Sequence, residues 1–143
     1  MKRLILFLLL VNATIVISQN SDTHTSFRQI TGVLIDENEM PFPGQNVIIL
    51  GTTVGTQTDF DGKFCLTIPN DILVFISLPF CFEQITRQVK SDDTHLILQI
   101  GKKKRKSERA MIKWNLVSDK QKLDFQSIYR GNAYLKAQKS YCQ

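Results

Sequence analysis

Histidine, the most common catalytic side chain, is nearly lacking in this sequence: only His24 and His95 occur among 143 residues. A zinc peptidase needs a histidine and a glutamate close together and a distant second histidine. Neither histidine has a glutamate at such a spacing. No histidine is placed to activate a serine or cysteine, and no glycine-flanked nucleophile turn occurs. We therefore expect no enzymatic activity and no cofactor, with His95 as a strand-edge residue.

Cysteine is also scarce, and the three that occur, Cys65, Cys81 and Cys142, cannot all pair within one chain. One thiol must stay free or bond to another chain. A bridge between Cys65 and Cys81 would require neighbouring strands with facing side chains. The sequence leaves the pairing open.

An apolar run of membrane-spanning character is lacking outside residues 1–18. There, Lys2 and Arg3 precede an apolar stretch, the pattern of a secretory signal peptide that is cleaved after Ser18. An uncleaved anchor is the alternative, but a spanning helix needs about 20 apolar residues. No cysteine stands at or just after the expected cleavage site, which excludes a lipid-attached N-terminal cysteine. We expect an exported protein that is periplasmic, outer-membrane-associated or secreted.

Charge is divided unevenly along the chain, although the overall balance is +5. Residues 19–100 carry ten acidic and four basic side chains, which gives −6. Residues 101–143 carry twelve basic and three acidic side chains, which gives +9. An acidic body is therefore followed by a basic tail.

Short runs rich in valine, isoleucine, phenylalanine and threonine alternate with turn residues through the body of the chain. They predict seven strands, at residues 29–36, 45–50, 53–58, 63–68, 72–78, 81–89 and 94–100. In the fourth strand, Phe64, Leu66 and Ile68 share a face that we expect to be buried, whereas the opposite face should be wet. The fifth strand is apolar almost throughout, as is typical of a central strand covered on both faces. The pattern predicts an all-β fold, a seven-stranded antiparallel sandwich or barrel.

Four segments of this body, 30–36, 41–47, 51–64 and 73–75, occur in an order that resembles the carboxypeptidase regulatory-like domain family. The shared pattern is a strand ending in a turn, a proline–glycine entry to a second strand, a glycine–threonine run, two spaced aspartates with a glycine, and a phenylalanine strand. The resemblance implies a transthyretin-like (prealbumin-like) sandwich. Pro79-Phe80 departs from a usual glycine–tyrosine pair, and Asn38-Glu39 departs from a turn that usually contains glycine.

The resemblance also implies a setting, because such domains often stand at the N-terminus of TonB-dependent outer-membrane transporters. Plug and barrel sequences do not follow within these 143 residues. We therefore expect a free-standing accessory protein of the cell envelope or an offshoot of the family. The expected organisation is a signal peptide at 1–18, the sandwich domain at 28–100, and a basic linker with a docking tail at 101–143.

Segment 51–64 raises the question of a ligand loop. Its residues that match the family pattern are Gly51, Gly55, Asp59, Asp61, Gly62 and Phe64. A calcium site with Asp71 is disfavoured, because the third oxygen ligand and the closing glutamate of an EF-hand loop are missing. A phosphate loop is disfavoured because Gly62-Lys63 opens a strand and no hydroxyl follows. We interpret the segment as a strand, a turn closed by aspartate, and the start of another strand.

The basic tail is expected to be a linker followed by a weakly structured docking segment, since its apolar residues keep no clean helical period and Gly131-Asn132 breaks any helix. The residues expected to dock are Lys102, Lys103, Lys104, Arg105, Lys106 and Trp114. Clustered cations bind nucleic acid, but export argues against that partner. An envelope protein or an anionic membrane surface is the expected partner, and a merely solvated linker is the alternative.

These observations favour a non-catalytic exported module for protein–protein or envelope contact, accessory to a TonB-dependent transport system. The competing interpretation is a small carbohydrate- or peptide-binding protein, in which Trp114, Tyr129 and Tyr134 stack on the ligand.

Overall fold

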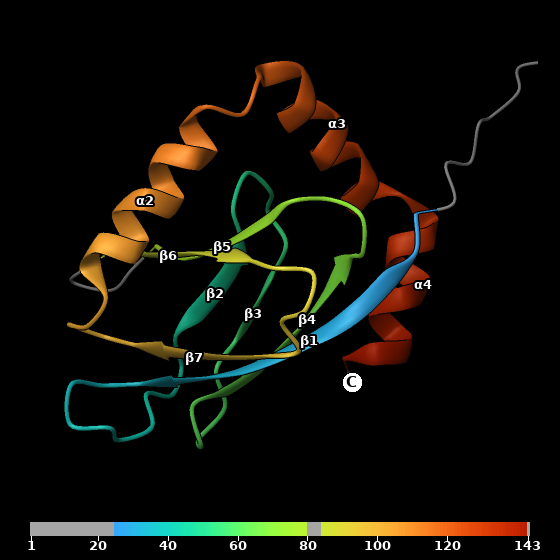
Figure 1. Cartoon of the computed structure of the whole chain (residues 1–143). Helices are drawn as coiled ribbons and strands as arrows, with labels where there is room; N and C mark the ends of the chain where they lie inside the picture. The colour runs from blue at the N-terminus through green and yellow to red at the C-terminus, as the bar shows by residue number, and fades with distance from the viewer. Residues whose placement is uncertain (1–24, 80–83, 143) are drawn as a thin grey trace, which may run out of the picture.

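The computed structural model describes residues 25–79 and 84–142. Seven strands and three helices follow one another along these residues (Figure 1). The strands are β1 (Phe27–Ile35), β2 (Asn46–Ile49), β3 (Gly55–Gln57), β4 (Lys63–Pro69), β5 (Val74–Leu78), β6 (Ile85–Val89) and β7 (His95–Gln99). The helices are α2 (Lys104–Asn115), α3 (Asp119–Arg130) and α4 (Asn132–Tyr141). The predicted signal peptide, His24, Cys81 and the start of the predicted sixth strand lie outside the described residues.

The strands form two sheets, and all seven predicted strands are confirmed in their order. β1 lies between β4 and β7 in one sheet, and the other sheet has the order β3-β2-β5-β6. The pairings are antiparallel except that of β1 with β7, which is parallel (Figure 1). The prediction of a purely antiparallel sandwich is therefore wrong at this pair. The five strands between β1 and β7 supply the long connection that a parallel pair requires.

The core lies between the two sheets and is formed by alternate residues of their strands. β5 is buried along its whole length, which confirms the prediction of a strand covered on both faces. Each fully buried aliphatic side chain contributes about 1.5–3 kcal/mol relative to an exposed one. The fully buried strand residues include Ile30, Leu34, Val47, Ile49, Ile68, Val74, Ile76, Leu78 and Leu98.

Three helices follow the strands, which corrects the expectation of an all-β chain with a weakly structured tail. α2 packs on β6, whereas α4 packs on β4 and β1. In Figure 1 the helices form an arch whose arms are α2 and α3, with α4 at the far end. Gly131 lies between α3 and α4, which confirms the helix break predicted at this position. Within residues 25–79 and 84–142, no helix is both long and apolar enough to span a bilayer.

The outer face of β4 is covered at its Thr67 end, contrary to the expectation that it is wet, whereas Lys63 at the start of the strand is exposed as expected. The predicted inner face is buried, with Phe64, Leu66 and Ile68 each at most 5% exposed. Thr67 points to the other face and is equally buried, since α4 packs there. The Thr67 hydroxyl lies 3.7 Å from Cys142 Sγ, at the end of α4. Alternation along β4 thus fails to reveal the second layer, because a sequence pattern cannot show what packs on a half-polar face.

A disulfide joins Cys65 of β4 to Cys142, immediately after α4, across a sequence separation of 77. This bond excludes the bridge between Cys65 and Cys81 that the sequence left open. It fixes the last helix covalently to the sandwich.

A chain of aromatic rings links the helices to both sheets. The rings follow the order Phe75, Trp114, Phe125, Tyr129, Tyr134 and Phe27, with neighbouring centroids 4.7 to 6.3 Å apart in edge-to-face geometry. Such pairs add about 0.5–1.5 kcal/mol beyond the area that they bury. Tyr129 and Tyr134 are only 4% and 1% exposed, so they cannot stack on a sugar as the competing interpretation expects. They hold the tail on the sandwich instead.

Burial of the two tyrosines makes stability sensitive to alkaline pH. Burial raises the pKa of Tyr134 from 10.0 to about 12, and burial and then the neighbouring Tyr134 raise the pKa of Tyr129. In the unfolded chain both groups titrate near pH 10 and release protons that the folded state retains. Stability is therefore fully present below pH 10 and falls as the pH rises toward 12.

We expect the free energy of unfolding, measured by urea denaturation, to fall by up to about 1.4 kcal/mol per pH unit for each tyrosine in that window. Tyr129→Phe removes one titrating group and a buried hydroxyl that has no hydrogen-bond partner. Its stability should match or exceed the wild type at neutral pH and fall less steeply above pH 10. Because the two proteins differ only in this hydroxyl, parallel pH profiles would contradict the assignment.

Candidate interaction surface

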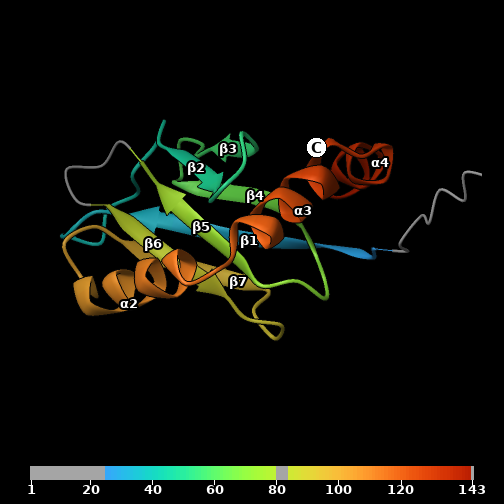
Figure 2. The same cartoon turned by 90° about the horizontal axis from the view of Figure 1, so that it is seen from above.

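α2 covers the free edge of β6 (Figure 2). The buried Ser107 hydroxyl accepts a hydrogen bond from Thr86 N at 2.7 Å and donates one to Gln84 O at 2.8 Å. Farther along the helix, Lys113 Nζ donates to Gln88 Oε1 at 2.8 Å. An edge strand presents unpaired backbone groups, so a helix that satisfies them protects the sheet from further pairing.

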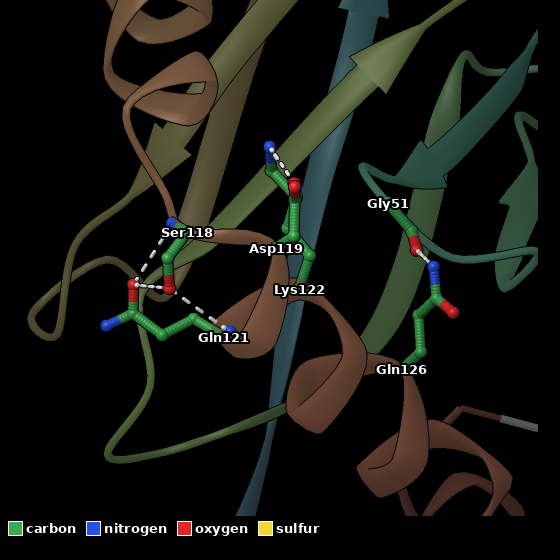
Figure 3. Close-up of polar contacts among 6 residues, drawn as sticks. All are labelled: Gly51, Ser118, Asp119, Gln121, Lys122 and Gln126. Atoms are coloured by element: carbon green, nitrogen blue, oxygen red, sulfur yellow. Dashed lines mark hydrogen bonds and ion pairs between the residues drawn. The ribbon is translucent and has the colours of Figure 1, made fainter.

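Gly51, the first glycine of the family pattern, meets the helices directly. It has a φ of 85°, and a Cβ atom at this position would lie 2.4 Å from the Trp114 ring. Gln126 Nε2 of α3 donates to Gly51 O at 2.8 Å (Figure 3). Trp114, expected to dock to a partner, therefore packs against the chain's own loop and against Phe75 of β5. The loop at Gly51 positions both arms of the arch.

The corner between α2 and α3 is closed by a capping box (Figure 3). Ser118 Oγ accepts from Gln121 N at 3.3 Å, and Gln121 Oε1 accepts from Ser118 N at 3.2 Å. Lys122 Nζ lies 3.6 Å from Asp119 Oδ1 and 5.6 Å from the centre of the Trp114 ring. The capping box satisfies backbone N–H groups at the N-terminus of α3, which fixes where this helix begins.

A groove of about 330 Å³ lies between this corner and the connection from β4 to β5. Its apolar lining includes Trp114, Phe125 and Ile72, and its carboxylates are Asp71 and Asp124. Asp71, weighed above as a calcium ligand, therefore lies apart from the turn that contains Asp59. The groove has room for an apolar side chain, and its two carboxylates favour a neighbouring cation.

The turn between β3 and β4 contains Asp59, Asp61 and Gly62 of the family pattern, whereas Gly55 begins β3 and Phe64 lies in β4. Asp59 Oδ1 accepts hydrogen bonds from the backbone N–H groups of Asp61 and Lys63, at 2.9 and 2.8 Å. Asp61 forms an ion pair of 2.9 Å with Lys63, and Gly62 has a φ of 69°. Both carboxylates thus have partners within the turn. Across the described ranges 25–79 and 84–142, no group of three or more histidine, cysteine, aspartate or glutamate side chains is arranged to hold a metal ion.

The basic block is the start of a helix, which corrects its interpretation as a linker. Lys103, with a φ of 66°, is the residue that precedes α2, and the first turn of α2 contains no acidic residue. Cations at the positive N-terminal end of a helix dipole each cost about 0.3–1 kcal/mol. All five side chains, Lys102, Lys103, Lys104, Arg105 and Lys106, are exposed. This charge pattern opposes helix stability, so stability of α2 does not explain it.

The outward face of α2 combines cations with aliphatic side chains. Arg105, Arg109, Ile112 and Leu116 follow spacings of four, three and four residues, which places them on one face of the helix. Ile112 is 59% and Leu116 80% exposed, although both are large hydrophobic residues. We call these four residues the outer stripe. The buried residues Ser107 and Ala110 occupy the opposite face, toward the sandwich.

The sequence profile of the CarboxypepD_reg-like domain family matches residues 30–112. The chain belongs to this family. The CarboxypepD_reg-like match begins in β1 and ends inside α2, so that α3 and α4 lie beyond it.

Three curated proteins resemble the chain over shorter stretches. The identity is 38% over 63 residues with TonB-dependent receptor P39 and 36% over 84 residues with TonB-dependent receptor P3, both of Formosa agariphila. It is 42% over 52 residues with TonB-dependent receptor SusC of Bacteroides thetaiotaomicron. These stretches cover 44%, 57% and 35% of this chain, but only 6%, 8% and 5% of the respective relatives. The chain therefore corresponds to a small part of each receptor.

Sequence reasoning missed the helices that this CarboxypepD_reg-like chain places next to the family's loop. The signals were present: Ser118 and Gln121 have the spacing of a capping box, and Phe125 and Tyr129 are four residues apart. The exposed residues Leu116 and Leu123 obscured the period, because they do not lie on the buried face.

Proposed function

We propose that this member of the CarboxypepD_reg-like family is a non-catalytic exported module that makes contacts at the bacterial cell envelope, accessory to TonB-dependent transport. The observation that carries the proposal is the similarity of the chain to stretches of three proteins that are named TonB-dependent receptors. The contact surface would be the arch of helices, because the family's Gly51 loop anchors both of its arms.

The disulfide supports export independently of the N-terminal sequence. Such bonds persist in oxidising compartments such as the bacterial periplasm and are rare in the cytosol. Cys65 and Cys142 lie in different elements, so their bond joins parts of the fold that are distant in sequence.

The histidine chemistry supports a non-catalytic role. His95 Nδ1 lies 3.0 Å from Thr31 Oγ1 at the exposed start of β7, next to a neutral hydroxyl. We expect no peptide hydrolysis by the full-length protein with added zinc. Zinc-dependent hydrolysis that a chelator abolishes, and that is retained through purification, would overturn this part of the proposal.

The envelope role is tested by fractionation and cross-linking in the native host, with the full chain carrying a C-terminal tag. We expect oxidised protein outside the cytoplasm, with a TonB-dependent receptor identified by mass spectrometry among its cross-linked partners. Arg105→Gln/Arg109→Gln should reduce the cross-linked fraction, whereas the charge-matched control Lys63→Gln/Lys90→Gln, which changes two exposed cations of the sandwich, should leave it unchanged. Reduced protein confined to the cytosol would refute the proposal.

The groove beside Trp114 favours a second candidate function, the binding of a short peptide with an apolar residue next to a lysine or arginine. Asp71 and Asp124 would pair with the cation, and the apolar lining would receive the neighbouring side chain. Trp114 is the only tryptophan in the sequence, so its fluorescence reports directly on the groove. A saturable change in emission that Asp124→Asn weakens would support this function, and unchanged emission with a library of such peptides would exclude it.

A further inference from the structure

The outer stripe of α2 combines charged and large apolar side chains that are exposed on the surface of the fold. Its two arginines belong to the half of the helix nearest the basic block, and its two aliphatic residues lie at the corner with α3. Ser107, Ala110 and Trp114 face the sandwich, whereas the stripe faces outward, with Ile112 bordering a pocket beside Gln84 and Thr86. A single exposed aliphatic residue is ordinary on a protein surface. Here two exposed aliphatic residues, Ile112 and Leu116, lie on the same helix face as two arginines, and together the four form an amphipathic face.

The charge distribution points this face toward an anionic surface. The helical region, residues 101–143, has a net charge of +9, whereas residues 19–100 have −6. Such a separation orients the whole molecule in an electric field, with the helices toward negative charge and the sandwich away from it. The cations in the first turn of α2 oppose its dipole, so an anion outside the chain would offset a cost that α2 bears alone.

We propose that the outer stripe binds the surface of a membrane that contains anionic phospholipids. Arg105 and Arg109 pair with headgroup phosphates, while Ile112 and Leu116 enter the boundary between headgroups and acyl chains, as in amphipathic helices that lie in the membrane plane. A convex helix face suits a fluid, flat surface, because lipids rearrange around it without a preformed groove. This inference rests on the proposed envelope role and specifies what the arch contacts.

The test uses the full-length oxidised protein and two kinds of vesicle, one of phosphatidylcholine alone and one of equal parts of phosphatidylcholine and phosphatidylglycerol. Flotation should recover the protein with the anionic vesicles and not with the neutral ones. Recovery should fall as salt is added, because the screening length shortens to about 3 Å at 1 M salt.

Paired variants locate the contact. Arg105→Gln/Arg109→Gln should weaken binding about 30-fold, since each cation contributes about 1 kcal/mol, or about a factor of five, near such a surface. Ile112→Ser/Leu116→Ser should weaken it at least about tenfold at equal charge. The control Leu135→Ser/Lys136→Gln removes the same types of side chain from α4, which lies at the other end of the arch (Figures 1 and 2), and should change little. Trp114 emission without vesicles verifies that each variant is folded.

The outcomes separate this inference from the function on which it rests. Binding that is equal in stripe variants and wild type, or equal on both kinds of vesicle, overturns the stripe as a lipid site. Receptor cross-linking in cells without any vesicle binding also overturns it, and identifies a protein as the occupant while the envelope role stands. Charge-dependent binding that both stripe variants lose and the α4 control retains supports it.

Discussion

Replacing Cys142 with serine is expected to lower the free energy of unfolding by about 2–4 kcal/mol. The bond to Cys65 closes a loop across 77 residues of sequence, so its loss gives the unfolded chain many more conformations. The folded state also loses the covalent tie between α4 and β4. Urea denaturation followed by circular dichroism, with wild type and variant under oxidising conditions, measures the difference.

Reductant provides the matched comparison. Reduced wild type should fall to the stability of Cys142→Ser, and the variant should itself be insensitive to reductant. Of the four samples, wild type and variant with and without reductant, only the oxidised wild type should have a higher urea midpoint. If the oxidised wild type and the variant unfold at the same urea concentration, the bridge does not stabilise the fold.

Gly62→Ala is expected to destabilise the sandwich by about 2–5 kcal/mol, the sum of a left-handed backbone penalty and steric overlap. Gly62 has a φ of 69°, and a Cβ atom there would lie 2.3 Å from the carbonyl oxygen of Leu34 and 3.0 Å from the amide nitrogen of Phe42. Both are backbone atoms of neighbouring segments, so no side-chain rotation relieves the overlap. The same urea assay measures the effect.

Gly44→Ala is the matched control for this prediction. Gly44 has a φ of 72°, but no heavy atom lies within 4 Å of a Cβ atom built on it. Gly44→Ala should therefore lower the free energy of unfolding only by the left-handed backbone penalty, about 1–2 kcal/mol. Equal losses at Gly44 and Gly62 would mean that close backbone approach is not why glycine occupies the family's aspartate–glycine turn.

The strands could be predicted because their information is local. Each of the seven is a run of β-branched and aromatic residues between turn formers, and the apolar content of β5 also predicted its burial on both faces. The turn at Asp59 could be predicted for the same reason, since an aspartate that accepts from the backbone two residues ahead needs no distant partner.

The pairings and the second layer could not be predicted, because they depend on residues far apart in sequence. The register that places Thr31 beside His95 joins the first strand to the last, and the disulfide joins β4 to the end of α4. The helical tail was misjudged for a related reason: Phe125 and Tyr129 are buried only because strands and helices already stand beside them.

The candidate surface was predicted in part. The sequence identifies the basic block and Trp114, but it does not show that Trp114 packs inside the fold while the basic residues stay on the surface. Trp114 is committed to Gly51 and β5, whereas Arg105 belongs to a face that also includes Arg109, Ile112 and Leu116. That face becomes visible only when the segment is known to be helical, because the four residues are scattered in the linear sequence.

The ring-to-ring contact between Phe27 and Tyr134 has a consequence for the order in which the chain acquires its structure. β1 is synthesised early, but β7, which pairs with one of its edges, and α4, which packs on it, are synthesised later. A topology with such distant partners folds slowly, in milliseconds to seconds for small domains. The delay leaves β1 without its final partners until α4 has been made. Formation of the Cys65–Cys142 disulfide, with an external oxidant accepting the two electrons, would then make the late-formed assembly difficult to undo.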